Sequence, residues 1–469
     1  MLADELFFAP VTELSAQIRA RKLSPVELTE GYLRRLEAHG PRLGAVAAVM
    51  HETARREARE AEREIQAGRY RGPLHGIPYG VKDLVATREA NTTWGAAPYK
   101  DQRFDFDATI VERLRAAGAV LVAKLAMVEL AGGMGYNRAD ASLQGACRTP
   151  WNTNFWSGGS SSGPGAATAA GLVAFSIGSE TSGSIITPAS FCGVSGLRPT
   201  YGAVSRHGAM ALSWTLDKLG PMCRSAKDCE LVFAAIAGRD PRDASSRDFD
   251  FGFKSRRARP LPTPLRLAVM KDSYEKAQPE VRDNFLRTLD VLRKFATVEM
   301  DVALPDFPYG PAVGTIVSAE GASAFRDLIE AGRLKELASP VGRTGGYTAS
   351  LVTAVDYLQA MRLRAPMRRA WSEMFKKYTV LVAPSRSSVA YPVDKNFEDA
   401  YPGLAASSPI GASNLVGVPA ISIPNGFGQN NLPTGVQFVG PAWSDRMLLD
   451  LADRYQQATD WHRRTPPMQ

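Results

Sequence analysis

The sequence predicts an α/β protein in which a large mixed, twisted β-sheet is covered on both faces by helices. Three observations support this fold class. Short apolar runs such as Ala119–Ala123 and Thr379–Ala383 are typical of buried strands. Longer polar or amphipathic segments alternate with these runs, as in a sheet with helices packed against it. The chain shows no internal repeat, which argues against a stacked-repeat architecture.

The first part of the chain is predicted to contain three helices and a strand. Ser24-Pro25-Val26-Glu27 has the pattern of a capping box with proline at the first helical position. The apolar residues that follow it share one helical face: Leu28, Tyr32, Leu33 and Leu36. A very polar surface helix is expected at about residues 51–67. A third helix is expected at residues 107–117, before the buried strand that ends at Lys124.

Glycine-rich segments dominate the middle of the chain. Residues 129–156 are irregular, and we expect them to form a loop that lines a substrate site. A short helix that leads into a buried strand is expected within Ala166–Ile177. Turns are expected at Gly196–Gly202 and Leu216–Pro221, where glycine and proline recur.

The second half continues the alternation of strands and helices. Residues 303–350 have only a weak pattern and are predicted to form a flexible cover. The remaining elements are expected as strands at Leu265–Val269, Thr379–Ala383, Pro419–Pro424 and Gly435–Val439, helices at Pro279–Ala296 and Val355–Tyr378, and a terminal helix.

Charge and cysteine content narrow the possible functions. The 469 residues include 56 Lys and Arg against 48 Asp and Glu, a net charge of +8. The densest basic cluster, Lys254–Arg259, is typical of a solvated loop, and without a nucleic-acid motif no nucleic-acid partner is expected. Neither a signal-peptide pattern nor a long apolar run is present, so we expect a cytoplasmic protein away from membranes. The four cysteines lack metal-ligand spacing, so no metal is expected.

Two turns rich in glycine and serine are the strongest candidates for chemistry. Residues 158–163 read Gly-Gly-Ser-Ser-Ser-Gly, and residues 179–188 read Ser-Glu-Thr-Ser-Gly-Ser-Ile-Ile-Thr-Pro. Glycine permits positive φ angles and lets peptide N–H groups approach a ligand. A serine nucleophile in these turns needs a base and donors for an oxyanion.

Lys82 is the candidate base. Local or surface roles are favoured for the five histidines: His39, His51, His75, His207 and His462. Lys82, in contrast, lies in an apolar stretch punctuated by glycine, Gly72–Leu84, and is expected to be internal. Burial disfavours the ammonium and can leave a neutral amine. A surface or ion-paired lysine is the alternative.

Together these segments resemble the amidase signature family of serine hydrolases. The matching pieces are Gly80-Val81-Lys82-Asp83, the two serine turns, Phe191-Cys192-Gly193 and Gly196–Gly202. The signature core covers about residues 72–228, and a weaker match at Gly417–Gly440 extends the resemblance over most of the chain. It implies the amidase signature fold and a single domain over residues 1–469, with variable substrate-cover segments at about 303–350 and 385–409.

The resemblance also implies a Ser-cisSer-Lys triad. Lys82 falls on the catalytic lysine, Ser160 on the bridging serine whose peptide bond is cis, and Ser184 on the nucleophile. Ser160 would relay a proton between Ser184 and neutral Lys82. The oxyanion hole would be formed by the peptide N–H groups of Thr181, Ser182, Gly183 and Ser184.

The chain departs from the family pattern beside the nucleophile. Where many members have Asp-Thr-Gly-Gly-Ser-Ile-Arg, residues 180–186 read Glu-Thr-Ser-Gly-Ser-Ile-Ile. Ser182 adds a side chain beside the oxyanion hole, and Ile186 removes a cation, so we expect an apolar or aryl substrate. The residues expected to contact it are Gly132, Gly133, Met134, Tyr136, Ser161 and Ile186.

The sequence therefore predicts a stand-alone amidase that hydrolyses linear C–N bonds through an acyl-enzyme on Ser184. The family also acts on esters, anilides and carbamates (urethanes), which remain possible substrates. No metal and no organic cofactor are expected. The predicted partner is a small-molecule amide or carbamate, with no nucleic acid and no membrane, and the chain is expected to be a monomer or homodimer.

Two alternatives stay open. The first is the glutaminase (A) subunit of a tRNA-dependent amidotransferase, which shares the signature. Those subunits resemble this chain near Asn414–Pro419 and carry, slightly upstream, an acidic residue that binds the glutamine amino group. Here the upstream segment Leu404–Ala412 contains no carboxylate. The second is an α/β-hydrolase esterase that uses Ser161 in Gly159–Gly163 as its nucleophile. That motif requires a preceding strand, and Asn152–Trp156 is a poor one.

Overall fold

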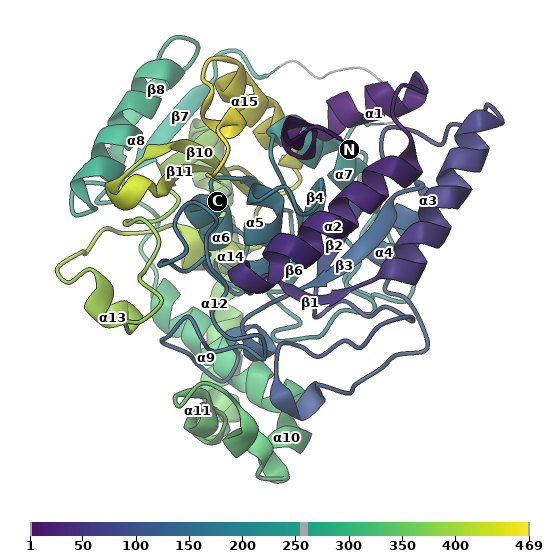
Figure 1. Cartoon of the computed structure of the whole chain (residues 1–469). Helices are drawn as coiled ribbons and strands as arrows, with labels where there is room; N and C mark the ends of the chain where they lie inside the picture. The colour runs from purple at the N-terminus through teal and green to yellow at the C-terminus, as the bar shows by residue number, and fades with distance from the viewer. Residues whose placement is uncertain (1, 254–260, 468–469) are drawn as a thin grey trace.

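The computed structural model describes residues 2–253 and 261–467. The basic cluster Lys254–Arg259, expected in a solvated loop, lies outside the described residues. Within them, one sheet of eleven strands runs through the molecule and helices pack around it (Figure 1). Across the sheet the strands follow the order β1-β3-β2-β4-β6-β5-β10-β11-β9-β7-β8.

The sheet is mixed, which confirms the predicted fold class. β2 runs parallel to β3 and β4, and β7 runs parallel to β8 and β9, whereas the other neighbouring pairs are antiparallel. The strands are β1 Val46–Val49, β2 Pro78–Lys82, β3 Val120–Leu125, β4 Phe175–Glu180, β5 Ser195–Arg198, β6 Lys218–Cys223, β7 Arg266–Met270, β8 Thr297–Val302, β9 Val380–Pro384, β10 Ala420–Phe427 and β11 Pro433–Val439.

Helices connect the strands, and the capping box begins one of them as predicted: Ser24 Oγ accepts hydrogen bonds from the Val26 and Glu27 N–H groups at 3.1 Å. The α-helices are α1 Val11–Arg19, α2 Pro25–Leu43, α3 His51–Gln66, α4 Thr109–Ala116, α5 Ser162–Ala169, α6 Ile186–Cys192, α7 Ala226–Ile236, α8 Pro279–Leu292, α9 Tyr309–Ala324, α10 Arg326–Glu330, α11 Gly342–Ala349, α12 Ala354–Lys377, α13 Phe397–Ala400, α14 Ile410–Val416 and α15 Asp445–Gln457. Short 3-10 helices lie at Asp4–Phe8, Ala97–Tyr99, Glu129–Gly132, Arg333–Glu336, Gln429–Asn431 and Trp461–Arg463.

Helices cover both faces of the sheet. Successive strand residues point to opposite sides, and in β9 the residues on both sides are apolar, so both faces need a covering layer. Val380 and Val382 of β9 share a hydrophobic cluster with residues of α7, α8 and α15. Leu381 and Ala383, the alternate residues of the same strand, pack with residues of α9 and α12. The core is therefore divided into layers on the two sides of the sheet.

Two segments expected as turns, Gly196–Gly202 and Leu216–Pro221, are interior strands in part, whereas Tyr201, Gly202 and Leu216 do lie in turns. Gly196 belongs to β5, and Gly220 and Pro221 belong to β6, which lies between β4 and β5. A Cβ atom on Gly220 would lie 2.0 Å from the carbonyl oxygen of Leu197, so glycine is what lets the two strands approach. Glycine and proline in a central strand conceal its apolar pattern, and for this reason the prediction of turns was wrong for the strand residues of these segments.

The segment 303–350, whose sequence pattern is weak, is largely helical, and its role as a substrate cover stays a prediction. It contains α9, α10 and α11, which Figure 1 shows together at one end of the molecule. α9 is rich in glycine and alanine and has little contrast between its faces, so its sequence gives a weak helical pattern. In the part of the chain that the structure describes, no helix is both long and apolar enough to cross a membrane.

Candidate active site

Lys82 is the last residue of β2, in the interior of the sheet, where its side chain has 0% exposure. Its Nζ donates hydrogen bonds to Ser160 Oγ at 2.7 Å and to Ser179 Oγ at 2.9 Å. Among the described residues no carboxylate pairs with it. The equally buried Lys124 on neighbouring β3 differs, because its Nζ lies 3.2 Å from Asp83 Oδ1.

Burial sets the protonation state of Lys82. Because a buried ammonium loses its hydration, burial lowers the pKa of Lys82 from its ordinary 10.5 to about 7, although the charges of Asp217 and Glu180 act in the opposite direction. Neutral and charged lysine are therefore present in comparable amounts near pH 7. A neutral amine can take a proton from a hydroxyl group that it contacts, which is the role of a general base.

The first serine turn brings Ser160 to Lys82 and connects the two turns. Ser160 is buried two residues before the start of α5, and the peptide bond between Gly159 and Ser160 is cis. The next residue, Ser161, accepts a hydrogen bond from the Ser179 N–H at 3.1 Å and donates to the Ser179 carbonyl at 3.0 Å. Its N–H donates to the carbonyl of Ser184 at 3.2 Å. Ser161 thus holds the second turn against the first.

The second serine turn, residues 181–184, joins β4 to α6 and contains the predicted oxyanion donors. Ser184 is half-buried and Ser182 is exposed. Gly183 has a φ of +93°, a conformation that favours glycine. Within the described ranges, Ser184 Oγ has no hydrogen-bond partner, so the structure brings Lys82 and Ser160 into contact and leaves the hydroxyl of Ser184 free.

A buried ionic network lies behind this turn, and the sequence analysis did not find it. Glu180, the last residue of β4, accepts hydrogen bonds from the Ile185 and Ile186 N–H groups at 2.8 and 3.0 Å. It also accepts from Arg198 Nη1 at 3.1 Å and Asn414 Nδ2 at 2.8 Å. Burial would raise the pKa of Glu180, but the Arg198 guanidinium and these hydrogen bonds hold it below its ordinary value. The carboxylate thereby anchors the start of α6 just after Ser184.

A cavity of about 220 Å³ opens beside these residues. Ser179, which contacts Lys82, and Thr181 of the second turn both line it. Most of the other lining residues are apolar: Leu84, Ala131, Ala209, Met210, Ala211, Leu212, Trp214, Leu219 and Ala244. The cavity therefore places a largely apolar space beside the end of β4 and the second serine turn.

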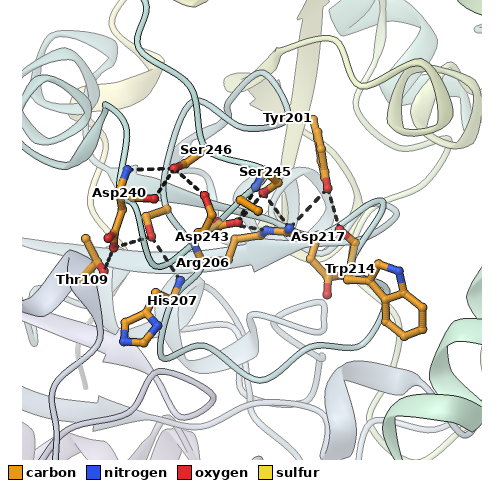
Figure 2. Close-up of polar contacts among 12 residues, drawn as sticks. Thr109, Tyr201, Arg206, His207, Trp214, Asp217, Asp240, Asp243, Ser245 and Ser246 are labelled. Carbon is orange, nitrogen blue, oxygen red and sulfur yellow. Dashed lines mark hydrogen bonds and ion pairs between the residues drawn. The ribbon is translucent and has the colours of Figure 1, made fainter.

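Charged groups on the cavity wall already have protein partners (Figure 2). Arg206 Nε lies 3.5 Å from Asp243 Oδ2, and its Nη1 donates to the carbonyl of Trp214. Arg242 Nε lies 3.1 Å from Asp240 Oδ1. The charges of the wall are therefore largely neutralised, and the surface left for a ligand is mainly apolar.

The six residues expected to contact substrate are not among those that line this cavity. A Cβ on Gly133 would meet Leu212 of the cavity wall at 2.4 Å, so this glycine borders the wall. Tyr136 instead makes edge contacts with Trp156 and Phe397. The others are placed as follows: Gly132 beside the ring of Tyr136, Met134 against α11, Ser161 between the serine turns, and Ile186 in the cluster under α9 and α12. Their role in substrate binding stays a prediction.

The histidines that could compete with Lys82 are engaged elsewhere. His75 is buried, and its Nδ1 accepts a hydrogen bond from the Arg71 N–H at 3.1 Å. His207 lines the cavity and stacks on Phe106, with ring centroids 5.7 Å apart. Within residues 2–253 and 261–467, no side chain of either histidine is hydrogen-bonded to a serine. The same ranges contain no group of three His, Cys, Asp or Glu residues placed to hold a metal ion.

Three comparisons with known proteins agree on the family to which the chain is similar. A model of the Amidase family matches residues 27–449. The glutamyl-tRNA(Gln) amidotransferase A subunit of Chloroflexus aggregans is 34% identical over 99% of both chains. The solved peptide amidase of Stenotrophomonas maltophilia is 31% identical, covers 98% of both chains and superposes with a TM-score of 0.84. The solved glutamyl-tRNA(Gln) amidotransferase A subunit of Thermotoga maritima is 26% identical over 99% of this chain and 98% of its own, with a TM-score of 0.78.

These relatives contradict the expected set of partners. The sequence analysis excluded nucleic acid, yet relatives that match nearly the whole chain are named as one subunit of an enzyme for glutamyl-tRNA(Gln). The exclusion rested on the absence of a basic patch and of a nucleic-acid motif. One member of a larger assembly needs neither, because another member can supply the contacts with the RNA.

Proposed function

This chain belongs to the amidase signature family, whose enzymes act on C–N bonds, and we propose that it hydrolyses a linear amide through an acyl-enzyme on Ser184. The contact between Lys82 Nζ and Ser160 Oγ carries the proposal. A lysine that is fully buried without a carboxylate partner is costly to keep. Its contact with a serine hydroxyl supplies a chemical reason, since a neutral amine there can serve as the base for a nucleophile.

In the proposed acylation step, Ser184 Oγ attacks the carbonyl carbon of the substrate and a C–O bond forms. The proton of Ser184 passes to Ser160 Oγ, and the proton of Ser160 passes to Lys82 Nζ. The Ser160–Ser184 contact that this transfer needs is expected to form when substrate binds, because catalytic hydrogen bonds of free enzymes often tighten only then. The peptide N–H groups of residues 181–184 donate to the developing oxyanion.

The reaction is completed by two further steps. The C–N bond breaks, and the proton on Lys82 returns through Ser160 to the nitrogen of the leaving amine. A water molecule then attacks the acyl carbon while the same relay removes its proton, and Ser184 leaves as a hydroxyl. One amide and one water give one acid and one amine, without oxidation or reduction.

Two substrate classes are candidates. The first is an amide, anilide or carbamate with an uncharged apolar group, cleaved by the chain alone. The apolar lining of the 220 Å³ cavity beside Ser179 and Thr181 favours it. The similarity to a peptide amidase over 98% of the chain is also in keeping with a stand-alone enzyme.

The second candidate is glutamine, whose amide nitrogen would serve an amidotransferase assembly. The names of the curated relatives, 33–35% identical over 95–99% of this chain, favour this candidate over a stand-alone amidase. Against it stands the absence of a carboxylate in residues 404–412, the stretch in which the resemblance to those subunits implies an acidic residue for the glutamine amino group. Sequence similarity and local chemistry therefore point to different substrates of one reaction.

Two measurements on the purified chain test the proposal. Labelling with a fluorophosphonate, followed by mass spectrometry, should modify Ser184, and a label on Ser161 would refute the assigned nucleophile. Product release is then measured for aryl amides, aryl carbamates, esters and glutamine. Turnover of the aryl substrates supports the first candidate. Turnover of glutamine alone, above all if it increases when the other components of an amidotransferase are added, supports the second.

A further inference from the structure

Asp217 lies directly before β6, at the wall of the cavity described above (Figure 2). One carboxylate oxygen, Oδ1, accepts a hydrogen bond from the Thr181 hydroxyl at 2.6 Å. The other, Oδ2, accepts from the Leu212 N–H at 2.9 Å and from the Ser213 N–H at 2.8 Å. One side chain thus joins the turn that precedes Ser184 to the segment that walls the cavity.

We propose that Asp217 is a positioning residue that fixes the oxyanion turn of residues 181–184 and keeps it in register with the cavity wall at residues 212–213. The turn is then held at both ends. Glu180 holds its far end through the N–H groups of Ile185 and Ile186, and Asp217 holds its near end through Thr181. This inference rests on the proposed hydrolysis at Ser184.

The contacts show why an ionised carboxylate suits this position. Burial raises the pKa of Asp217, while the hydrogen bonds from Thr181 and from the two N–H groups oppose that rise. All three groups donate to Asp217, and a protonated acid would present a hydrogen where one of them now donates. An asparagine of the same shape could keep the three contacts only by turning its NH₂ group toward the Thr181 hydroxyl, which would then accept instead of donate. Its neutral oxygen also accepts more weakly than a carboxylate, so Asp217→Asn weakens the hold on the turn and on the two N–H groups.

The expected loss follows from the geometry of catalysis. Removing an oxyanion donor costs about 10²–10³ in kcat, and a misplacement of about 1 Å costs about 10². In Asp217→Asn the donors remain but are less well fixed, so we expect kcat to fall by about 10- to 100-fold. KM should change less, because oxyanion donors act mainly in the transition state.

The pH dependence of kcat/KM is a second readout. It distinguishes a role of Asp217 at the active site from a role that only stabilises the fold. The negative charges that raise the pKa of Lys82 belong to Asp217 and Glu180, and Glu180 is itself paired with Arg198. Removing the charge of Asp217 therefore lowers the pKa of Lys82, and the acid limb of the pH profile of kcat/KM moves to lower pH. Thr181→Val removes the hydroxyl and keeps the charge, so it should lower kcat without moving the limb.

The experiment measures kcat, KM and the acid limb for Asp217→Asn, Thr181→Val and Thr181→Ser. Thr181→Ser keeps the hydroxyl that donates to Asp217, so its kcat should fall less than that of Thr181→Val. Asp445→Asn is a matched control, since buried Asp445 also accepts a threonine hydroxyl at 2.6 Å and an N–H at 2.8 Å, both from Thr200. Its acid limb should stay at the wild-type pH.

The outcomes distinguish this inference from the proposed function. If the wild type is not labelled at Ser184, the proposed hydrolysis fails. If it is labelled but Asp217→Asn keeps both the wild-type kcat and the wild-type acid limb, the role of Asp217 is refuted. If Asp217→Asn does not fold, as judged by circular dichroism and thermal melting, the comparison of Thr181→Val with Thr181→Ser decides, and equal kcat values for the two overturn the inference.

Discussion

Protonation of Lys82 provides a direct test of the mechanism, and its size follows from the structure. With a pKa of about 7 instead of 10.5, the neutral fraction of Lys82 is about 10% at pH 6, about half at pH 7 and about 90% at pH 8. A solvated lysine would be neutral in only about one molecule in three thousand at pH 7. Burial thus increases the amount of available base at pH 7 about a thousandfold.

The assay is kcat/KM for a chromogenic aryl amide from pH 5.5 to 9.5, at constant ionic strength, with the rate of fluorophosphonate labelling measured in parallel. Below pH 7 the rate should fall about tenfold per pH unit, and above pH 8 it should be nearly constant. Lys82→Ala should lose this limb and keep a small rate that rises with hydroxide. Ser161→Ala should keep a limb with the same midpoint, because that hydroxyl does not contact Lys82.

One result would refute this reasoning. If the wild-type rate continued to rise to about pH 10, Lys82 would titrate as a solvated lysine, and the buried contact with Ser160 could not supply a base at neutral pH. An acid limb that survives in Lys82→Ala but disappears in His207→Ala would instead indicate a serine-histidine mechanism, since His207 also lines the cavity.

Three further predictions concern the same residues. Ser184→Ala should abolish labelling and nearly all turnover, whereas Ser160→Ala should lower turnover by orders of magnitude and still allow slow labelling. The combined losses should be far from additive, because the residues act as one unit; additive losses in the double variant would contradict this. Lys82→Met should be more stable than the wild type at pH 7, as measured by urea unfolding. That difference should shrink by about 1.4 kcal/mol per pH unit up to about pH 10.5, because the unfolded wild type binds the extra proton in this window. Chelation by EDTA should leave activity unchanged, and a loss restored by zinc would show that a metal takes part.

The sequence was informative where one residue stood out against its surroundings. Lys82 could be predicted as internal because it is a single cation in an apolar stretch, and the structure buries it completely. Glu180 and Asp217 are charged residues in similar stretches, but a carboxylate is also common in turns, so nothing marked them as buried anchors. The partners of Glu180 come from β5 and α14, and such long-range contacts cannot be read from local patterns.

Some strands could not be predicted because they contain glycine at positions where close packing requires it. Gly220 is needed where β6 approaches Leu197, and the same glycine makes the strand look like a turn. The prediction on partners was wrong for a different reason. The composition of one chain carries no information about the other proteins with which its relatives assemble.

The hydrogen bond between Asn414 and Glu180 also has a consequence for biosynthesis. It links residues 234 positions apart through the amide nitrogen of Asn414, and the amide oxygen of the same side chain accepts a hydrogen bond from Lys218 Nζ. A nascent chain that has emerged only to residue 400 contains Lys82, Ser160 and Ser184, but it lacks the α14 amide that helps to hold the carboxylate anchor. The nucleophile would therefore become competent only late in synthesis, after its own strand has already emerged. Covalent labelling of Ser184 would then report completion of the fold, and half-made chains would be protected from acylation.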